Sequence, residues 1–401
     1  MFQFDPEGTI TSVRGFKAAG IHCGIKKQKK DLALIYSDIP STAAGTFTMN
    51  KVSAAPNEIS KKIIKQKNKI RAILVNSGVA NACTGIQGYN NALDCQSYLA
   101  GKMNIKPDEV LISSTGVIGK QLPVDNLLNG IDKIIPELSE AGGNDAAEAI
   151  LTTDTRTKSF AGKIQLNGGE GTIGSICKGS GMIMPNMATM LAFLTTDVSI
   201  ESSVLQKLLT EAINETFNKV SVDGETSTND MVIILANGLS RIKIKDGTDN
   251  YAAFLEGLTA ICSEMAKAIV SDGEGATKLI NVTVNSAFTK NDANIIAKAI
   301  VNSPLVKTAM NGNDANWGRI ISVAGNCGVI FNPENVSIKF DDLPILSPNF
   351  ITDVNEDEAT QLLDKDEVNI FVDIGEGHES STWRTCDFSE EYVRINSKYR
   401  T

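Results

Sequence analysis

One stretch of the chain combines residue types that could do chemistry. Residues 178–197 read KGSGMIMPNMATMLAFLTTD, with Gly179 and Gly181 making an irregular approach to Thr189 and apolar residues following it as a buried strand. A threonine at the head of a buried strand, preceded by the small Ala188, fits a nucleophile that the chain exposes by cutting itself. Cleavage before Thr189 would free an α-amine with a reference pKa of about 8, and that amine could serve as the base. The alternative is an ordinary core strand with a loop in front of it.

The numbers of histidines and cysteines limit which other nucleophilic or metal-dependent mechanisms the chain could use. Only two histidines, His22 and His378, are present, so a Ser-His-Asp or Cys-His mechanism would have to use one of them, and a multi-histidine metal site cannot be built. The seven cysteines are an odd number without a CxxC pair, which indicates reduced thiols in a cytoplasmic protein. Residues 1–10 hold no apolar run, so no signal peptide is expected, and no stretch approaches the ~18 apolar residues of a membrane span.

The composition is that of a globular protein with two or three domains. The chain has 401 residues, of which 42% are hydrophobic and 21% charged. Its formal net charge of −9 disfavours nucleic acid and anionic membrane as main partners, because either would need a concentrated basic surface. We expect two lysine clusters to be solvated faces: Lys26, Lys27, Lys29 and Lys30, and Lys61, Lys62 and Lys65.

Two glycine patterns resemble nucleotide-binding motifs only in spelling. Gly169, Gly171 and Gly174 satisfy GxGxxG, but the residues that follow predict a strand, whereas a dinucleotide site needs a helix there. We therefore expect a hairpin turn. Gly116 and Gly119 are separated by two residues where a P-loop has four, so the sequence does not predict a Walker motif.

Short apolar runs and helical periods alternate along the chain without a regular βαβ rhythm. Strands are expected at residues 31–36, 46–48, 70–75, 110–112 and 231–236, a hairpin at 158–166 and 172–177, and helices at 90–103, 201–220, 251–270 and 291–302. A new alternation starts at Leu279 (LINVTVNSA), which indicates a second domain. We predict a mixed α/β fold of layered sheets and helices, with one domain at 1–280 that contains Thr189 and an α/β domain at 281–401.

Several blocks of sequence resemble one known family along nearly the whole chain. MPNMATMLAFLTTD is similar to the processing site of the ornithine acetyltransferase family, the glutamate N-acetyltransferases of arginine biosynthesis. Further blocks agree in order: residues 76–85, 114–119, 222–230, 272–278, 302–309, 316–319 and 399–401. The chain departs from the family pattern at Val79, Glu225 and Ala315, none of which touches the proposed nucleophile.

The resemblance implies a self-processing acyltransferase. Its fold would be the sandwich of sheets and helices shared with self-cleaving aminopeptidase-like enzymes, followed by a C-terminal α/β domain. Thr189 would be the nucleophile, and Ala188 would be the residue left behind by cleavage. The products would be an α-chain of residues 1–188 and a β-chain of residues 189–401, with two of each chain in the assembly.

The resemblance also assigns an oxyanion hole and substrate contacts. Thr115 and Gly116 would form the oxyanion hole, since a tight turn can aim hydrogen-bond donors at the developing alkoxide. The implied substrate contacts are Thr153, Lys178, Thr189, Glu274, Asn396 and Thr401. Lys178 could hold a substrate carboxylate and lower the pKa of the Thr189 amine. Glu274, flanked by two glycines that let the backbone approach a ligand, suits the cationic end of ornithine.

The implied reaction moves an acetyl group from N2-acetyl-L-ornithine to L-glutamate by a ping-pong cycle through acetyl-threonine. The resemblance implies that no metal or organic cofactor is needed and that the enzyme is cytoplasmic. Acetyl-CoA is a further candidate donor, although the sequence shows no motif for binding it. Two alternatives stay open. One is a hydrolase of the related aminopeptidase or amidase type, in which water resolves the acyl-enzyme, and the other is a non-catalytic amino-acid-binding protein that keeps the fold.

Overall fold

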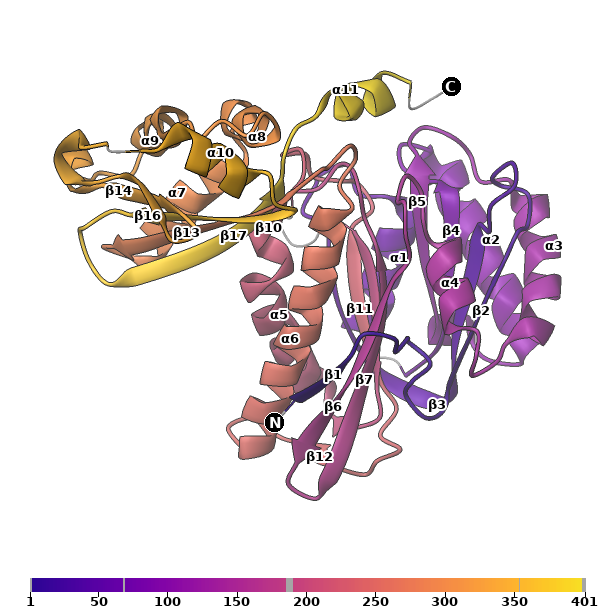
Figure 1. The fold of residues 1–401 in the computed structure, drawn as a ribbon. Helices are drawn as coiled ribbons and strands as arrows, with labels where there is room; N and C mark the ends of the chain where they lie inside the picture. Colours follow the sequence, from indigo (N-terminus) through magenta and orange to yellow (C-terminus); the bar gives the residue numbers. More distant parts are fainter. Residues whose placement is uncertain (1, 68, 185–189, 353, 399–401) are drawn as a thin grey trace. The chain divides into compact units, whose positions relative to one another are not determined.

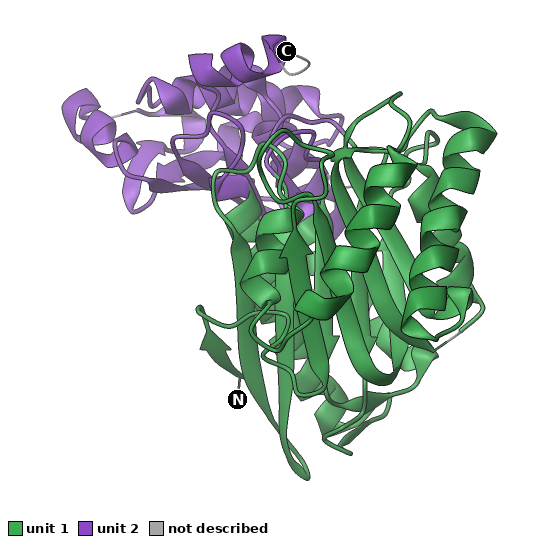
Figure 2. Ribbon diagram, turned by 90° about the vertical axis from the view of Figure 1, so that its right-hand side faces the viewer, with its two compact units in different colours: residues 1–179, 185–218, 226–269 green, residues 180–184, 219–225, 270–401 purple. Residues whose placement is uncertain are grey.

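The chain folds as two compact units, which Figure 2 shows in green and purple. The computed structural model describes residues 2–67, 69–184, 190–352 and 354–398. Unit 1 contains residues 1–179, 185–218 and 226–269, and unit 2 contains residues 180–184, 219–225 and 270–401. The boundary therefore lies earlier than the expected position near residue 280, and two short segments from the middle of the chain belong to unit 2.

Unit 1 is built around one long sheet with helices packed against it (Figure 1). Its strands are β1 (Phe2–Asp5), β2 (Phe16–Ile21), β3 (Leu32–Phe47), β4 (Ile70–Val79), β5 (Val110–Val117), β6 (Lys158–Leu166), β7 (Gly169–Lys178), β8 (Leu191–Thr196) and β11 (Met231–Ala236), with β9 (Ser199–Ile200) and β12 (Lys243–Ile244) forming a separate small pair. Its helices are α1 (Ala55–Lys65), α2 (Gly85–Met103), α3 (Val124–Ile134), α4 (Gly143–Ala149), α5 (Ser202–Glu215) and α6 (Asp249–Ser271), the last of which runs on into unit 2.

Strand β3 joins two parts of this sheet. Its first half lies between β2 and β4, and β4 continues to β5. Its second half pairs with β11, which leads on to β8, β7, β6 and β1. The register with β4 shifts between Tyr36 and Ser41. Pro40 lies in this interval and has no N–H to donate to a strand ladder, so the change of partners falls where regular pairing is interrupted.

Apolar residues from both parts of the sheet share a single core. Leu34 and Ile35 from β3, Phe193 from β8 and Ile233 from β11 are all fully buried in one cluster. All six residues of β8 and all six of β11 are buried, as expected for apolar strands in the middle of a covered sheet. Helices α1 and α5 both contact β3.

Unit 2 is a six-stranded mixed sheet with its own apolar core. The strand order is β10-β17-β13-β16-β14-β15. The strands are β10 (Val220–Ser221), β13 (Leu279–Ala287), β14 (Ser337–Phe340), β15 (Leu343–Leu346), β16 (Glu367–Asp373) and β17 (Glu379–Cys386), and the helices are α7 (Lys290–Val301), α8 (Pro304–Asn311), α9 (Trp317–Asn326), α10 (Glu356–Leu363) and α11 (Glu390–Ser397). Helix α7 packs on β13 and β17 and contacts α8 and α9.

Most of the expected elements are observed, and the predicted mixed α/β class with layered sheets and helices is confirmed. The GxGxxG residues lie in the β6–β7 hairpin, as predicted. The expectation of separate strands at 31–36 and 46–48 is wrong, because both segments belong to β3. The seven cysteines are unpaired. No helix in the described part of the chain is both long and apolar enough to cross a membrane.

Candidate active site

The predicted cleavage site immediately precedes a buried strand. Ala188, Thr189 and the terminal Thr401 lie outside the described residues. Strand β8 begins at Leu191, and all six of its residues, LAFLTT, are buried. The prediction of a buried strand after Thr189 is therefore confirmed, and the described part of the site can be built outward from the start of β8.

The start of β8 is fixed between two neighbouring strands. Leu191 is paired with Lys178 of β7 on one side and with Met231 of β11 on the other. The backbone N–H of Met231 also donates to the carbonyl oxygen of Met190 at 2.9 Å. Lys178, a predicted substrate contact, therefore lies at the same edge of the sheet as the first residues of β8.

The predicted oxyanion turn lies at the end of strand β5. Thr115 is buried, and Gly116 is paired with Gly78 of the parallel neighbour β4. Gly116 has a φ of +131°, which residues with a side chain rarely adopt. A Cβ atom at this position would lie 2.3 Å from the carbonyl carbon of Gly78, a backbone atom that cannot move aside. Both conformation and space therefore require glycine at this turn.

Asn229 connects this turn to β11, the strand that pairs with β8. Its Nδ2 donates to the carbonyl oxygens of Ala80 at 2.6 Å and of Ser114 at 2.8 Å. The Ser114 hydroxyl in turn donates to Oδ1 of Asn76 in β4 at 2.5 Å. These residues come from three of the sequence blocks that carry the family resemblance, and Asn229 stands just before β11. The ends of β4 and β5 are thus held beside the strand ends where β11 and β8 begin.

Lys178 is a buried cation with a polar surrounding. Only 9% of its surface is exposed, and its Nζ donates to the hydroxyl of Thr152 at 3.2 Å. Asp154 pairs with Lys158 nearby, with 2.7 Å between Nζ and Oδ1, and both side chains are fully buried. Burial would raise the pKa of Asp154, but the charges of Lys158 and Lys178 outweigh it and hold that pKa well below its usual range. Asp154 is therefore an anion that helps to stabilise the buried lysines.

Thr153, a predicted substrate contact, lies in a loop that Asp154 fixes. The Asp154 carboxylate accepts hydrogen bonds from the backbone N–H of Thr152 at 3.0 Å and of Gly179 at 2.7 Å. Thr153 itself is half-buried. The structure therefore brings Thr153 and Lys178 together at the C-terminal end of β7.

Lys26 is a neighbour of this region that the sequence did not reveal. We expected its cluster to be a solvated face, and for Lys26 this is wrong: the residue is half-buried, and its Nζ donates to the carbonyl oxygens of Lys30 at 2.8 Å and Leu151 at 2.6 Å. Burial lowers the pKa of Lys26 to about 8, Asp31 opposes that shift, and the charge of Lys178 adds to it. Asp31 also accepts a hydrogen bond from the backbone N–H of Lys26 at 2.8 Å and so holds the loop inward.

Lys26 connects the lysine region to the predicted oxyanion turn. A Cβ atom at Gly78 would lie 3.2 Å from Cγ of Lys26, so the lysine stem passes beside the residue that is paired with Gly116. Its charge and that of Lys178 are close enough to affect each other. Two cations therefore lie near the start of β8, an arrangement that favours an anionic group of a bound substrate.

Asp230 is another residue of this region to which the sequence assigned no role. It directly precedes β11 and is 2% exposed, and its Oδ2 has no hydrogen-bond partner among the residues that the structure describes. Burial raises the pKa of Asp230 well above its usual range, although Lys178 acts in the opposite direction. Its only signal in the sequence was its place in one of the resemblance blocks.

In unit 2, the structure brings two predicted substrate contacts into direct contact. Glu274 is buried, and its Oε2 accepts a hydrogen bond from Nδ2 of Asn396 in α11 at 2.8 Å. The backbone N–H of Glu274 donates to the carbonyl oxygen of Ser180 at 2.9 Å. A Cβ atom at Gly181 would lie 2.4 Å from the Glu274 carboxyl group, so glycine there leaves the space that the carboxylate fills. Glu274 is therefore an acidic group held between two segments distant from it in sequence, residues 180–181 and helix α11.

Known proteins resemble the chain over almost its whole length. The profile of the ArgJ family matches residues 17–401. The arginine biosynthesis bifunctional protein ArgJ of Listeria monocytogenes is 46% identical over 396 residues, which are 98% of this chain and 99% of that protein. The protein of the same name from Thermotoga neapolitana is 47% identical over 394 residues, 97% of this chain and 99% of that one. A solved structure, the ornithine acetyltransferase from Mycobacterium tuberculosis complexed with ornithine, is 36% identical with a TM-score of 0.44, covering 47% of this chain and 100% of that chain.

Proposed function

The chain belongs to the ArgJ family, and from that membership we propose that it cuts itself before Thr189 and then transfers acetyl groups with Thr189 as the nucleophile. It is an acetyltransferase of arginine biosynthesis. The donor is N2-acetyl-L-ornithine, and the acceptor is L-glutamate. The observation that carries the proposal is a junction of strand ends in unit 1. Asn229, which precedes β11, donates hydrogen bonds to the ends of β4 and β5. Strand β11 is paired with β8, so this junction lies beside the start of β8.

The proposed cycle has two half-reactions. The Thr189 hydroxyl attacks the acetyl carbonyl, its proton passes to the Thr189 α-amine, and that proton then goes to the departing amine of ornithine. The C–N bond to ornithine breaks, and an acetyl ester remains on Thr189. The amine of L-glutamate attacks this ester by the reverse path, which yields N-acetylglutamate and restores the free hydroxyl.

The junction contributes groups that suit the transition state. A turn at Thr115 and Gly116 can direct hydrogen-bond donors at the developing oxyanion, and donors of this kind are often worth about 3 kcal/mol. Lys178 and Lys26 supply positive charge for a substrate carboxylate. Lys178 would also disfavour protonation of the Thr189 amine, which leaves more of that amine able to act as a base.

In unit 2, we assign Glu274 to the side-chain ammonium of ornithine, with Asn396 holding its carboxylate in place. Thr153 and the terminal Thr401 are the remaining substrate contacts of the proposal. The cycle needs no metal or organic cofactor, because the acyl group arrives on the donor itself. We also propose that the α- and β-chains stay together in an assembly of two each, that the enzyme works in the cytoplasm, and that acetyl-CoA is a second candidate donor.

The position of a trapped acetyl group tests this function. A rapid quench of the enzyme with acetylornithine alone should leave one acetyl group per site, and peptide mapping should place it on the first residue of the β-chain. Adding L-glutamate should release the label as N-acetylglutamate. Label on a cysteine, on Ser180 or nowhere would reject the mechanism. Accumulation of acetate in place of N-acetylglutamate would identify a hydrolase of the aminopeptidase or amidase type.

Replacing Glu274 with glutamine should weaken the use of acetylornithine selectively. The change keeps the size of the side chain and its ability to accept the bond from Asn396, but it removes the charge proposed to meet the ornithine ammonium. We expect kcat/KM for acetylornithine to fall by about tenfold or more, which is about 1.4 kcal/mol of lost transition-state binding. Steady-state kinetics with varied acetylornithine measure this directly.

Glu391 offers a matched control for this substitution. It lies in α11, as Asn396 does, but its carboxylate is 41% exposed and pairs with Arg394 at 2.5 Å. Glu391→Gln should therefore leave kcat/KM for acetylornithine nearly unchanged. Self-cleavage should proceed normally in both variants, since it involves no bound substrate. Normal acetylornithine kinetics in Glu274→Gln would remove Glu274 from the proposed substrate contacts.

A further inference from the structure

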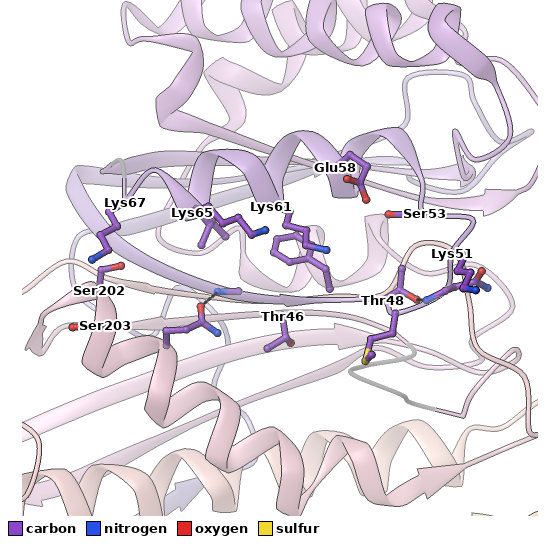
Figure 3. Close-up of a pocket in the computed structure, with 16 residues that line it drawn as sticks. Thr46, Thr48, Lys51, Ser53, Glu58, Lys61, Lys65, Lys67, Ser202 and Ser203 are labelled. Atoms are coloured by element: carbon purple, nitrogen blue, oxygen red, sulfur yellow. Dashed lines mark hydrogen bonds between the residues drawn. The ribbon is translucent and has the colours of Figure 1, made fainter.

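A groove of about 810 Å³ lies on unit 1 along the second half of β3. Helices α1 and α5, which both contact this strand, supply residues to its two sides. Figure 3 shows Lys61 and Lys65 extending from α1 over the strand, with Lys51 and Lys67 at the two ends. The volume falls in the range of about 300–1,000 Å³ that is typical of small-molecule sites.

The charge of this groove is opposite to that of the whole protein. Four lysines line it, Lys51, Lys61, Lys65 and Lys67, against one acidic residue, Glu58, although the chain carries a net charge of −9. Within the described residues, none of these lysines forms an ion pair. Lys61 and Lys65 also stand four residues apart on α1, a spacing at which like charges destabilise a helix slightly. The lysines thus concentrate positive charge without a structural partner, as an anion-binding surface would.

An uncharged polar group lies on the floor of the same groove. Thr46 lines the groove from the middle of its β3 segment, and only 4% of its surface is exposed. Its Oγ1 has no hydrogen-bond partner in the described part of the chain. A buried hydroxyl without a partner costs about 1–3 kcal/mol, so a ligand atom that bonded to it would recover stability. Figure 3 shows Thr46 in the middle of the groove, below the lysines of α1.

The N-terminus of α5 adds a second kind of anion-binding group. Ser202 and Ser203 form its first turn and line the groove, and the cap residue Glu201 makes no side-chain capping bond. The first backbone N–H groups of a helix point outward and carry partial positive charge, which favours phosphate. Lys67 is drawn beside Ser202 in Figure 3, so a lysine and the helix end serve the same space.

The positive surface continues past this helix end. A second hollow of about 770 Å³ shares Lys67 and Ser202 with the groove. It adds three lysines, Lys69, Lys243 and Lys245, and two acids, Glu201 and Asp246. Asp246 is already paired with Lys207 at 2.9 Å, so the added lysines extend the positive charge.

We propose that this lysine groove binds a nucleotide-sized ligand through a pyrophosphate, with its phosphates on the lysines and the N-terminus of α5. The groove is small and the rest of the protein is acidic, so binding of a nucleic acid strand is disfavoured. A pyrophosphate of this kind has two sources: the nucleotide portion of an acyl-carrying thioester such as acetyl-CoA, or a free nucleotide such as ADP. The groove reaches Phe47 of β3, which is paired with Met231 of β11. Met231 is paired in turn with Leu191, the first residue of β8. Only strand β11 therefore lies between this end of the groove and the start of β8.

Binding of ADP, coenzyme A and inorganic phosphate to the processed enzyme, measured by calorimetry at low salt, tests the proposal. We expect ADP and coenzyme A to bind, phosphate to bind much more weakly, and affinity to fall as salt is added. Lys61→Glu with Lys65→Glu should weaken ADP binding by about tenfold or more, because two attractions become repulsions. Thr46→Val removes only the hydroxyl and should weaken binding severalfold without disturbing the fold, since no hydrogen bond is lost.

Lys62 is the matched control, since it is an exposed lysine of the same helix that does not line the groove. Lys62→Glu should bind ADP as the unaltered enzyme does. Absence of binding of both ADP and coenzyme A, or equal binding by the Lys61→Glu/Lys65→Glu variant, would overturn the proposal and leave these lysines a solvated face.

Two further readouts separate the sources of the ligand. If acetyl-CoA supports N-acetylglutamate formation and the double variant loses this, the groove binds the donor. If ADP binds as tightly as coenzyme A and changes the rate with acetylornithine, the groove binds a free nucleotide. The acetylornithine reaction of the double variant without nucleotide should match that of the unaltered enzyme. The unaltered enzyme could also bind ADP and fail to transfer acetyl groups from acetylornithine. That result would contradict the proposed function but would still support the nucleotide site.

Discussion

Thr189→Ala should yield a single uncut chain of 401 residues with no acetyl transfer. Cleavage requires a side-chain oxygen to attack the Ala188 carbonyl, and the transfer requires the same oxygen to carry the acetyl group. One substitution therefore removes both reactions, and we expect the transfer rate to fall by about a thousandfold or more. Intact mass under denaturing conditions, compared with the unaltered protein, distinguishes one chain from fragments of residues 1–188 and 189–401.

Thr189→Ser is the companion variant, because it keeps the hydroxyl. It should cut itself at least in part, and the portion that is cut should transfer acetyl groups. Cleavage of the alanine variant at this same bond would show that another group performs the attack. Full transfer by the uncut alanine variant would equally remove Thr189 from the mechanism.

The second large effect is expected from Gly116→Ala. The new Cβ would lie 2.3 Å from the carbonyl carbon of Gly78, at a φ of +131°, so the β4–β5 pairing must open locally to admit it. Because the proposed oxyanion donors depend on this turn, both self-cleavage and transfer should slow by about a hundredfold or more, equivalent to about 3 kcal/mol. Gel analysis of cleavage over time and steady-state kinetics measure the two effects.

Gly119 separates the local steric effect from the general cost of alanine at a positive φ. Its φ is +79°, but a Cβ atom there would have no neighbour within 4 Å. Gly119→Ala should cost roughly 1–2 kcal/mol of stability and leave cleavage and transfer nearly intact. Equal behaviour of the two variants, with unchanged circular dichroism, would contradict the role assigned to the Gly116 turn.

The parts of the fold that local patterns encode could be predicted from the sequence. The β6–β7 hairpin follows from two alternating runs around a glycine-rich turn, and the helix over 251–270 follows from its apolar period. Strand β3 could not be predicted as one element, because Pro40 in its middle reads as a break, and only pairing with strands far away in the sequence joins its halves. Such pairing has no local signature.

The division into two units also depends on contacts between segments distant in sequence. Residues 180–184 join unit 2 because the Asp223 carboxylate accepts hydrogen bonds from the backbone N–H of Met182 at 2.6 Å and of Ile183 at 2.8 Å. These contacts span about forty residues, and nothing in the sequence between them marks a domain boundary. The sequence shows a change of pattern only at Leu279. That residue begins β13, the first long strand of unit 2, whereas unit 2 itself begins earlier in the chain.

The candidate site divides in a similar way. Family resemblance named Glu274 and Asn396, which the structure shows in contact, although 122 residues separate them. It gave no role to Lys26 or Asp154, whose properties depend on burial and on neighbouring charges. A lysine in a run of lysines has no feature that foretells a pKa of about 8, because that value comes from the fold around it.

The strand order gives the proposed cleavage a further consequence. Strands β8 and β11 lie between β7 and β3, so after the cut two strands of the β-chain are enclosed on both sides by strands of the α-chain. The products would be interleaved fragments that complement each other, and neither could leave without tearing two strand ladders. Unfolding would release two molecules where the precursor releases one, so reassembly would become second order and dependent on protein concentration. A mature enzyme of this kind would be easier to keep folded than to fold again, since the continuous chain that first set its register would no longer exist.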